Sequence, residues 1–342
     1  RERWPKVECI FLGTRNGLDQ RLLTKKGEKY FGISGSALPR GFGIGFLQAF
    51  SNMLRGLLES WFIFRRFKPD IIVAVGSYIA LGPVVIGRWK RIPVLLFESN
   101  VCMGRANRFL ARMANIIASG FPVYEVKSAS PKLHFTGHPI RKDLEQATRR
   151  QAQERFGLDP DKRTLLVVGG SQGATFINRC MIDAMDCIKH IHHKIQVIHL
   201  VGERHFDSLM ESYQPGTLSY QMVPYLDDMH LALRAADILI SRAGATIIAE
   251  AMYCQIPSIL IPYPFAMEQH QLSNAKYVSD RGAAVLIKED SLNAELLAEK
   301  IVELIEDQTL REHLKEGCRA LNLHNGLNNL VDLIMKMISR DV

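Results

Sequence analysis

A glycine-rich turn joins a predicted strand to a predicted helix in the stretch LLVVGGSQGATFIN, residues 165–178. Gly169, Gly170 and Gly173 remove side chains at the point where the strand ends and the helix begins. Bare backbone amides at the positive end of a helix dipole bind phosphate groups well, and the hydroxyl of Ser171 adds a neutral donor. The turn therefore predicts a phosphate site, although a tight turn in which glycine serves only packing has the same sequence.

A nicotinamide dehydrogenase is the first rival interpretation of this turn. Its fingerprint is GxGxxG after a strand, with an acidic residue near the end of the next strand. Glu203 follows IHLVG at such a place. The turn here reads GGSQGA, lacks the spacing between the first two glycines, and lies in the second half of the chain. These differences count against a dehydrogenase.

A second turn of small residues follows the strand predicted at 238–241. Arg242, Ala243 and Gly244 lead into a predicted helix that carries Glu250 about two turns further on. A carboxylate accepts hydrogen bonds from two vicinal hydroxyls, which a ribose presents. Glu250 stands among apolar neighbours, which favours a partnered and partly enclosed role over an exposed position on a surface helix.

A third polar stretch, PYPFAMEQHQLSNA at 262–275, follows the next predicted strand. It offers Glu268, Gln269, His270 and Gln271. Side-chain amides both donate and accept hydrogen bonds, so they suit the hydroxyls of a sugar. The three turns together indicate a ligand that carries phosphate, ribose and sugar hydroxyls.

The elements that must hold these turns alternate between strand and helix, which predicts βαβ units and parallel sheets covered by helices on both faces. The β-rich runs are 7–12, 71–75, 94–97, 116–118 and 133–136, then 164–168, 196–201, 220–223, 238–241, 258–262 and 284–287. They are too many for one sheet, so we expect an α/β fold with two doubly wound domains. The expected domains are 1–138 and 139–325, with TGHPIRKD at 136–143 as the hinge and a helix in 326–342 that returns to the first domain.

The net charge and the composition limit the kinds of partner and site that we expect. The formal charge is +8 and the pI about 9.2, which favours an anionic partner. The longest uncharged run, 71–87, is shorter than the roughly 20 residues of a membrane span and contains glycine and proline. His190, His192 and His193 have no carboxylate or thiol partner at a metal-ligand spacing, so a solvated helix end is the favoured interpretation.

Six motifs of the sequence are similar to those of a known family. GGSQGA, YLDDM, SRAGATIIAE, EQHQLSNA, GHPIR and ESNVCMGRANRFLA together resemble the MurG family of N-acetylglucosaminyltransferases. The resemblance implies a GT-B fold, in which two Rossmann-like domains face a cleft. It implies inverting transfer of GlcNAc from UDP-GlcNAc to undecaprenyl-linked lipid I, which gives lipid II for peptidoglycan. It also implies a peripheral position on the cytoplasmic face of the plasma membrane, with no cofactor, no metal and no nucleic-acid partner.

The resemblance also implies roles for single residues on the two sides of the cleft. The implied donor ligands are Ser171 and Arg141 for the diphosphate, the backbone of Leu226 for uracil, Ala245, Thr246, Ile247, Ile248 and Ala249 at the start of a helix near the nucleotide, Glu250 for the ribose and Gln271 for a sugar hydroxyl. Asn100 matches an asparagine of the first domain at the cleft. Tyr78 could line the acceptor side, and a core tyrosine is equally compatible. Asp227 and Asp228 are expected to cap and charge the start of a helix rather than to hold a metal.

The sequence departs from the family at its beginning. The family opens with a strand and a GGTGGH-type loop whose histidine is the usual candidate for the general base. This sequence starts about one βα unit later, so we expect an incomplete chain, with a truncated and inactive relative as the alternative. No base can be assigned. His138 is the remaining candidate here, although a histidine beside proline is more commonly a turn residue. Phe97, Ser99 and His138 also replace residues usual in the family.

The segment from residue 40 to 68 combines phenylalanine, leucine, isoleucine and Trp61 with five basic residues. Apolar anchors and cations together suit the surface of an anionic membrane. An ordinary amphipathic helix packed on the first sheet has the same pattern, and part of the segment must be that.

Two further functions remain open at this level. Another GT-B glycosyltransferase, such as a glycolipid synthase, would share the donor site and differ in its acceptor. A nucleotide-sugar-binding remnant would bind UDP-GlcNAc without transferring the sugar.

Overall fold

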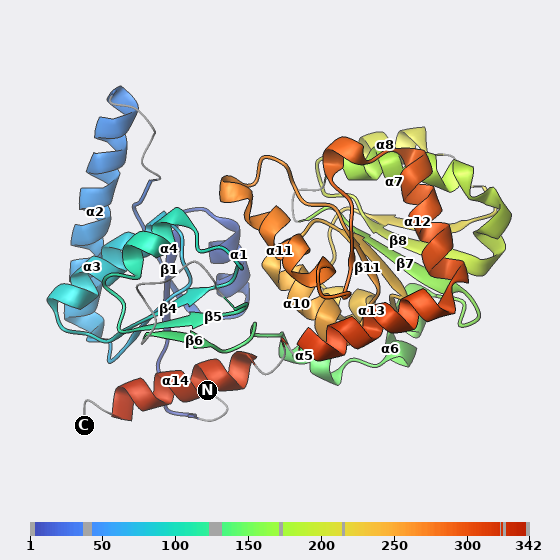
Figure 1. Cartoon of the computed structure of the whole chain (residues 1–342). Helices are drawn as coiled ribbons and strands as arrows, with labels where there is room; N and C mark the ends of the chain where they lie inside the picture. Colours follow the sequence, from blue (N-terminus) through green and yellow to red (C-terminus); the bar gives the residue numbers. More distant parts are fainter. Residues whose placement is uncertain are drawn as a thin grey trace.

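The computed structural model describes residues 4–36, 43–122, 132–170, 174–213, 216–321, 323 and 326–339. The chain folds into two α/β lobes joined near residue 140 (Figure 1). The predicted arrangement of two parallel-sheet domains is confirmed.

The first half of the chain contains β1 (Ile10–Thr14), α1 (Leu18–Lys25), β2 (Lys29–Ile33), α2 (Ile44–Phe67), β3 (Ile72–Ala74), η1 (Tyr78–Ala80), α3 (Leu81–Trp89), β4 (Val94–Glu98), α4 (Arg105–Leu110), β5 (Ile116–Ser119) and β6 (Leu133–Phe135). Strands β3, β4, β5 and β6 pair in that order as a parallel sheet. Their continuous apolar runs are what a sheet covered on both faces requires.

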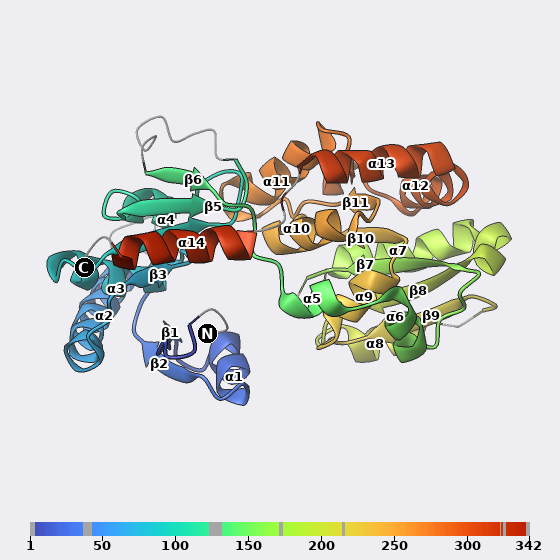
Figure 2. The same cartoon turned by 90° about the horizontal axis from the view of Figure 1, so that it is seen from below.

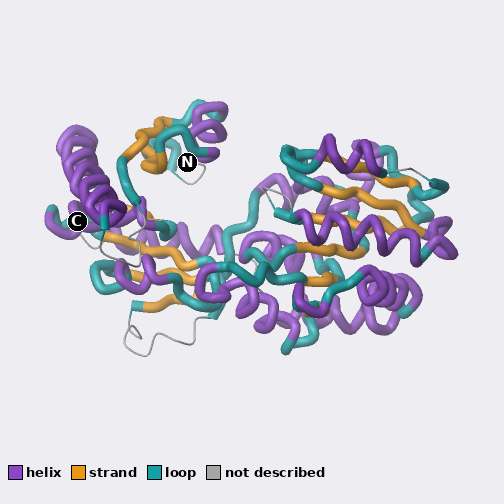
Figure 3. The backbone as a smooth tube through the Cα atoms, turned by 90° about the horizontal axis from the view of Figure 1, so that it is seen from above, coloured by secondary structure: helices purple, strands orange, loops and turns teal. Residues whose placement is uncertain are grey.

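The beginning of the chain differs from the expectation of one sheet for this half. Strands β1 and β2 form a separate two-stranded parallel sheet, which lies near the N label in Figure 3, apart from the other strands. The expected strand at 7–12 occurs instead at Ile10–Thr14, and the sequence analysis missed β2 altogether. In β2 only Ile33 is buried, so this strand lacks the apolar run by which the others were recognised.

The second half contains α5 (Lys142–Gln146), α6 (Arg149–Phe156), β7 (Arg163–Val168), α7 (Thr175–Cys187), η2 (Lys189–Lys194), β8 (Ile195–Leu200), α8 (Phe206–Ser212), β9 (Ser219–Val223), α9 (Met229–Ala235), β10 (Ile238–Ser241), α10 (Ala245–Cys254), β11 (Ser258–Leu260), η3 (Met267–Gln269), α11 (His270–Ser279), β12 (Val285–Leu286), η4 (Glu289–Ser291), α12 (Ala294–Glu306), α13 (Gln308–Leu321) and α14 (Gly326–Ser339). Its parallel sheet has the order β12-β11-β10-β7-β8-β9. The chain proceeds outward from β7 through β8 and β9, then returns to place β10 on the other side of β7. The strand order therefore reverses between β7 and β10, and ligands of open parallel sheets bind beside such a switch point.

Helices cover both faces of this second sheet and complete its core. One apolar cluster includes Leu166, Leu239 and Ile248 and lies toward α9 and α10. The other includes Val167, Met181 and Ile301 and lies toward α7 and α12. Two buried faces explain why these strands read as continuous apolar runs rather than as alternating patterns.

Helix α14 comes from the end of the chain and packs on the sheet of the first lobe. Met337 lies in a cluster with Leu95, Phe97 and Ala118. Asn329 donates a hydrogen bond from Nδ2 to the carbonyl oxygen of Thr136 at 2.7 Å. Figure 2 shows α14 lying along the first lobe, beside β3 and β5. The chain therefore crosses between the lobes twice.

Candidate functional site

The loop after β7 lies at the switch point of the second sheet. Gly169 and Gly170 follow the strand directly, and Gly170 has a φ of 96°, a left-handed value that favours glycine. Helix α7 begins just beyond, with Ala174 at its N-cap. Ser171 and Gly173 lie outside the described residues. The described part of the turn thus places bare backbone at the approach to a helix N-terminus.

The loop after β10 lies on the other side of the switch point. Gly244 is the extended N-cap residue of α10, and Thr246 in the first turn is exposed. The side chains of Ala245, Ile248 and Ala249 are buried in the apolar cluster under the sheet. Of the helix-start residues expected near the nucleotide, these three can reach a ligand only through their backbone, while Ile247 is half-buried.

Arg141 and Glu250 join the hinge to α10. Nε of Arg141 donates to Oε1 of Glu250 at 2.6 Å. Glu250 is 3% exposed, whereas the side chain of Arg141 is 41% exposed. Burial raises the pKa of the Glu250 carboxyl, and the neighbouring guanidinium opposes that shift. The sequence analysis assigned these residues to diphosphate and ribose separately; the structure brings them into direct contact.

The loop after β11 is held against the same edge. Arg242 forms an ion pair with Glu289, and its guanidinium lies 5.3 Å from the ring centroid of Tyr263. Gln271 accepts a hydrogen bond at Oε1 from the backbone amide of Tyr263 at 2.9 Å. Gln271, the predicted sugar ligand, thus also fixes the loop that precedes it. The charge on Arg242 is compensated by Glu289.

Asn274 connects the two lobes. It is fully buried, and its Nδ2 donates to Oδ1 of Asn100 at 3.0 Å and to the carbonyl oxygen of Ala243 at 3.3 Å. Its Oδ1 accepts from the amide of Val101 at 3.0 Å. One side chain therefore ties the first-lobe loop after β4 to the second-lobe loop after β10. Asn100 could be predicted from the sequence but Asn274 was not, although Asn274 lies within the EQHQLSNA motif.

Glu98 holds Asn100 in place on the first lobe. It is buried at the end of β4 and accepts hydrogen bonds from the Asn100 amide at 2.9 Å and from Nδ2 of Asn107 at 2.7 Å. Asn107 also lies against the turn at Gly76, which has a φ of 91° and leads to Tyr78. Glu98 thus links the loops after β3 and β4. The sequence analysis did not single it out, although a carboxylate ending an otherwise apolar strand was a visible signal.

His138 is buried at the hinge. Its ring makes an edge contact with Phe97 at 5.7 Å between centroids, and Nδ1 donates to the carbonyl oxygen of Pro139 at 3.2 Å. Burial lowers the pKa of His138. The imidazole is therefore neutral at physiological pH and enclosed under the start of α14, where Gly326 packs on its backbone.

The other predicted residues follow β3 in the first lobe and β9 in the second. Tyr78 is exposed in η1, and Leu226 is half-buried between β9 and α9. Asp228 is the N-cap residue of α9, but its side chain makes no cap hydrogen bond; it pairs with Arg155 at 2.9 Å instead. Asp227 lies 3.7 Å from Lys25 of the first lobe. The expected N-cap position is therefore confirmed for Asp228, although its side chain forms an ion pair in place of a cap hydrogen bond.

A small cavity opens between the lobes beside these loops. It has a volume of about 310 Å³ and is lined by Arg105, Arg108, Phe109 and Arg112 of the first lobe and by Glu268 of the second. Glu268 forms an ion pair with Arg108. Three guanidinium groups against one carboxylate leave this surface positive. Such a surface suits an anionic group.

The arrangement can bind a diphosphate and stabilise negative charge on it. The helix start beyond Gly170 and the guanidinium of Arg141 supply positive potential without a metal. Among the described residues no group of three or more histidine, cysteine, aspartate or glutamate side chains is placed to hold a metal ion. No helix in the described ranges is both long and apolar enough to cross a membrane.

Family models match both lobes. The glycosyltransferase family 28 N-terminal domain matches residues 1–119, and the glycosyltransferase family 28 C-terminal domain matches residues 164–324. The second match contains the loops after β7, β10 and β11, and the first contains Glu98 and Asn100.

Individual relatives agree with these matches. The UDP-N-acetylglucosamine--N-acetylmuramyl-(pentapeptide) pyrophosphoryl-undecaprenol N-acetylglucosamine transferase of Desulforamulus reducens is 33% identical, covering 99% of this chain and 92% of that protein. The Bacillus subtilis protein of the same name is 32% identical over 98% and 92%. The crystal structure of Acinetobacter baumannii MurG has a TM-score of 0.71 and 25% identity, covering 96% and 91%. On these grounds the chain belongs to the MurG family of N-acetylglucosaminyltransferases, within glycosyltransferase family 28.

Proposed function

We propose that this chain transfers GlcNAc from UDP-GlcNAc to undecaprenyl-linked lipid I and so makes lipid II for peptidoglycan. The observation that carries the proposal is the contact between Arg141 and Glu250 at the switch point of the second sheet. In UDP the ribose is bonded directly to the diphosphate, so the ligands of these two groups must be neighbours. An arginine for phosphate and a carboxylate for vicinal hydroxyls, 2.6 Å apart, meet that requirement.

The donor would then lie across the loops after β7 and β10. Its diphosphate would face Gly169, Gly170 and the start of α7, with Arg141 alongside. Its ribose would face Glu250, and its sugar would reach toward Gln271. Positive potential at the diphosphate favours departure of UDP, because charge develops on the leaving oxygen as the bond to the sugar breaks.

The acceptor would approach from the first lobe. In the transfer, a hydroxyl oxygen of the lipid I sugar bonds to the anomeric carbon of GlcNAc from the face opposite UDP. The bond to the diphosphate oxygen breaks, UDP leaves with the electron pair, and the hydroxyl proton passes to a base. The arginines at 105, 108 and 112 supply cations on this side for the pyrophosphate of the acceptor.

Membrane contact belongs to the same proposal, because the acceptor is anchored in a lipid bilayer. Helix α2 exposes a stripe of large apolar side chains with three- or four-residue spacing, at Leu47, Phe50, Leu54, Leu58 and Phe62. Arg55, Arg65, Arg66 and Lys68 are exposed on the same helix or at its end, whereas Arg40 lies outside the described residues. An apolar stripe bordered by cations suits the cytoplasmic surface of an anionic plasma membrane, where we place the protein as a peripheral enzyme.

The decisive experiment is a transfer assay with purified chain, radiolabelled UDP-GlcNAc and lipid I. We expect labelled lipid II in an amount that rises with the concentration of lipid I and is unaffected by added diacylglycerol. Transfer to diacylglycerol with none to lipid I would indicate a glycolipid synthase. Binding of UDP-GlcNAc without any transfer would indicate a nucleotide-sugar-binding remnant, and either result overturns the proposal.

Glu154→Gln is a matched control for Glu250→Gln. Glu154 lies on α6, is 63% exposed on its side chain and pairs only with Arg150 among the ion pairs of the described residues. We expect Glu154→Gln to keep transfer activity and Glu250→Gln to raise the KM for UDP-GlcNAc, because only Glu250 lies at the proposed ribose site.

A further inference from the structure

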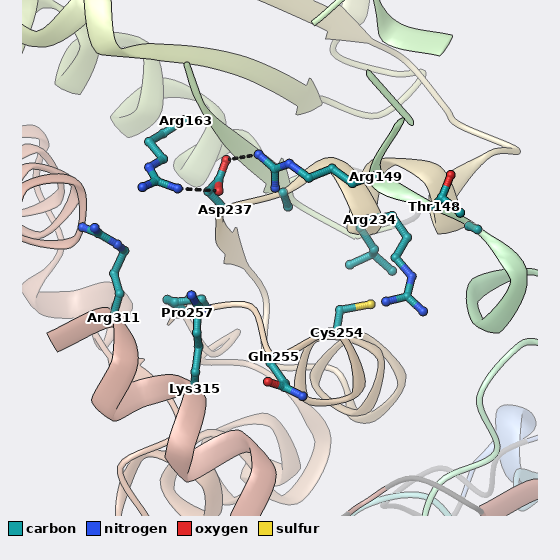
Figure 4. Close-up of a pocket in the computed structure, with 13 residues that line it drawn as sticks. Thr148, Arg149, Arg163, Arg234, Asp237, Cys254, Gln255, Pro257, Arg311 and Lys315 are labelled. Atoms are coloured by element: carbon teal, nitrogen blue, oxygen red, sulfur yellow. Dashed lines mark hydrogen bonds and ion pairs between the residues drawn. The ribbon is translucent and has the colours of Figure 1, made fainter. Parts of the chain in front are cut away.

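A cavity of about 390 Å³ lies at the opposite edge of the second sheet from the loops described above. Its wall includes Arg163 at the first position of β7 and Asp237 immediately before β10. Both mark strand beginnings, whereas the proposed nucleotide site lies where these strands end. Figure 4 shows basic side chains from several elements directed around this cavity. The cavity is therefore separate from the cleft.

One carboxylate anchors the cavity wall. Asp237 accepts from Nη2 of Arg149 at 2.8 Å, from Nη1 of Arg163 at 3.1 Å and from the amide of Thr164 at 2.9 Å. Figure 4 shows the two arginines on either side of it. A single negative charge is shared by two guanidinium groups, so part of their positive charge stays uncompensated.

Two more arginines are fixed by neutral partners. Arg234 donates from Nε and Nη2 to the carbonyl oxygen of Leu144 at 3.0 and 2.8 Å. Arg311, only 8% exposed, donates from Nη1 to the carbonyl oxygens of Leu304 and Ile305, both at 2.8 Å. Carbonyl oxygens satisfy the donors but carry no net charge. Both guanidinium groups are therefore held in place while remaining cationic.

Arg311 lies close enough to Arg163 for the two cations to repel each other. Burial lowers the pKa of Arg311 and repulsion from Arg163 lowers it further, while Asp237, Asp307 and Glu312 oppose the shift. Lys315 of α13 adds a fifth cation to the lining, and its carboxylate partner Glu312 is not part of the cavity wall. Helix α6 begins at the cavity, so its positive dipole end adds to the same potential.

We propose that this cavity binds a phosphate-bearing anion. Four arginines and one lysine from α6, β7, α9 and α13 line it, and the only carboxylate in the described lining is Asp237. Planar guanidinium groups bind phosphate oxygens in a bidentate manner. The volume lies at the lower end of the range of small-molecule sites, roughly 300–1,000 Å³, and accommodates a diphosphate group.

The test is calorimetric titration of the full chain with pyrophosphate at constant ionic strength. Saturating UDP is present, so that pyrophosphate does not compete for the proposed nucleotide site. We expect the double variant Arg149→Gln, Lys315→Gln to bind pyrophosphate at least about tenfold more weakly, because two charge-assisted contacts are lost. An unchanged affinity in the double variant, or no binding by the unaltered chain at millimolar pyrophosphate, overturns the proposal.

Arg150→Gln is the matched control. Arg150 follows Arg149 on α6, is 88% exposed on its side chain and pairs with Glu154 outside the cavity. The control should keep the affinity of the unaltered chain, and an equal loss in it would show only general attraction to a basic surface. Lys315→Gln alone serves if the double variant unfolds, since it breaks only the exposed pair with Glu312.

A second arm distinguishes a free phosphate compound from a lipid headgroup. Sedimentation with phosphatidylglycerol vesicles compares the same three proteins. Weaker pyrophosphate binding with unchanged vesicle binding assigns the cavity to a soluble anion. Weaker vesicle binding in the double variant, with Arg150→Gln unaffected, assigns it to a headgroup. Because UDP occupies the cleft throughout, failure of this proposal leaves the proposed transferase activity untouched, and the converse also holds.

Discussion

The guanidinium of Arg141 holds the buried carboxylate of Glu250 at 2.6 Å and thereby fastens the hinge between the lobes to helix α10. We predict that Arg141→Gln lowers the free energy of unfolding by about 1–3 kcal/mol at pH 7, since Glu250 is left buried without its cation. Without Arg141, the pKa of Glu250 rises further above its value in the unfolded chain. The loss of unfolding free energy in the variant should therefore grow with rising pH and shrink toward pH 5.

Urea denaturation at pH 5 and pH 8 measures this effect. The double variant Arg141→Gln, Glu250→Gln replaces both charges and should recover most of the loss at pH 8. A deficit that is the same at both pH values would show that the pair does not act through the charge of Glu250.

Asn274 should contribute to both stability and catalysis, because it fixes one lobe to the other. We predict that Asn274→Ala costs about 1–3 kcal/mol of unfolding free energy, since it leaves buried donors and acceptors unpaired. Transfer activity should fall as well, because the loops after β4 and β10 lose their shared contact. Asn293→Ala is the control: Asn293 caps α12, and its loss should cost about 1 kcal/mol while transfer is retained. Normal transfer by Asn274→Ala would contradict the role we assign.

Membrane binding should depend on α2. Leu58 is 60% exposed and Phe62 is 62% exposed, one helical turn apart. We predict that Leu58→Glu and Phe62→Glu each weaken binding to anionic vesicles about tenfold or more, because an apolar anchor worth roughly 1.5–3 kcal/mol is replaced by a charge. Charge reversal at Arg65 and Arg66 should weaken binding mainly at low salt. Met210→Glu on α8, another exposed apolar position, should have no effect. Vesicle binding that survives all four changes would exclude this surface.

Stability should fall in mild acid because of His199. This histidine is buried in β8, with Nδ1 2.7 Å from the Tyr220 hydroxyl and Nε2 3.0 Å from Oδ1 of Asn178. Burial lowers the pKa of His199 to about 3. At this position the unfolded chain binds a proton near pH 6.5 and the folded chain does not. The contribution of His199 to the free energy of unfolding is therefore complete above pH 6.5 and is lost progressively below it.

Because of His199, the free energy of unfolding should fall by about 2 kcal/mol between pH 6.5 and pH 5, at roughly 1.4 kcal/mol per pH unit. Denaturation of His199→Gln over the same range should show that much less acid sensitivity. His193→Gln, at an exposed histidine, is the comparison and should keep the full slope. Equal slopes in all three proteins would rule out His199 as the cause.

Much of the fold could be predicted because its strands are buried on both faces. The run LLVV before Gly169 is apolar throughout, and ILIS before Arg242 is apolar up to Ser241; each occurs as a strand close to its predicted bounds. Strand β2 could not be recognised in this way, because only Ile33 of its five residues is buried. Turn chemistry also located the loops at the switch point, since glycine and polar residues follow those strands directly.

The remaining features depend on contacts between distant residues. Asn274 and Asn100 are 174 positions apart, so no local pattern marks their hydrogen bond. The pairing of Arg141 with Glu250 spans 109 positions. The basic cavity assembles Arg149, Arg163 and Arg311 from three separate elements, and each alone reads as an ordinary surface cation. Such clusters form only in the folded chain, where the beginnings of neighbouring strands lie next to each other.

The placement of α14 has a consequence for protein synthesis. The sheet surface formed by Leu95, Phe97 and Ala118 is covered by residues near Met337, which are synthesised after the whole second lobe. The amino-terminal lobe therefore stays partly uncovered until α14 has been made, while the second lobe already has its own core. During synthesis the lobe that is made first is the one that finishes folding second.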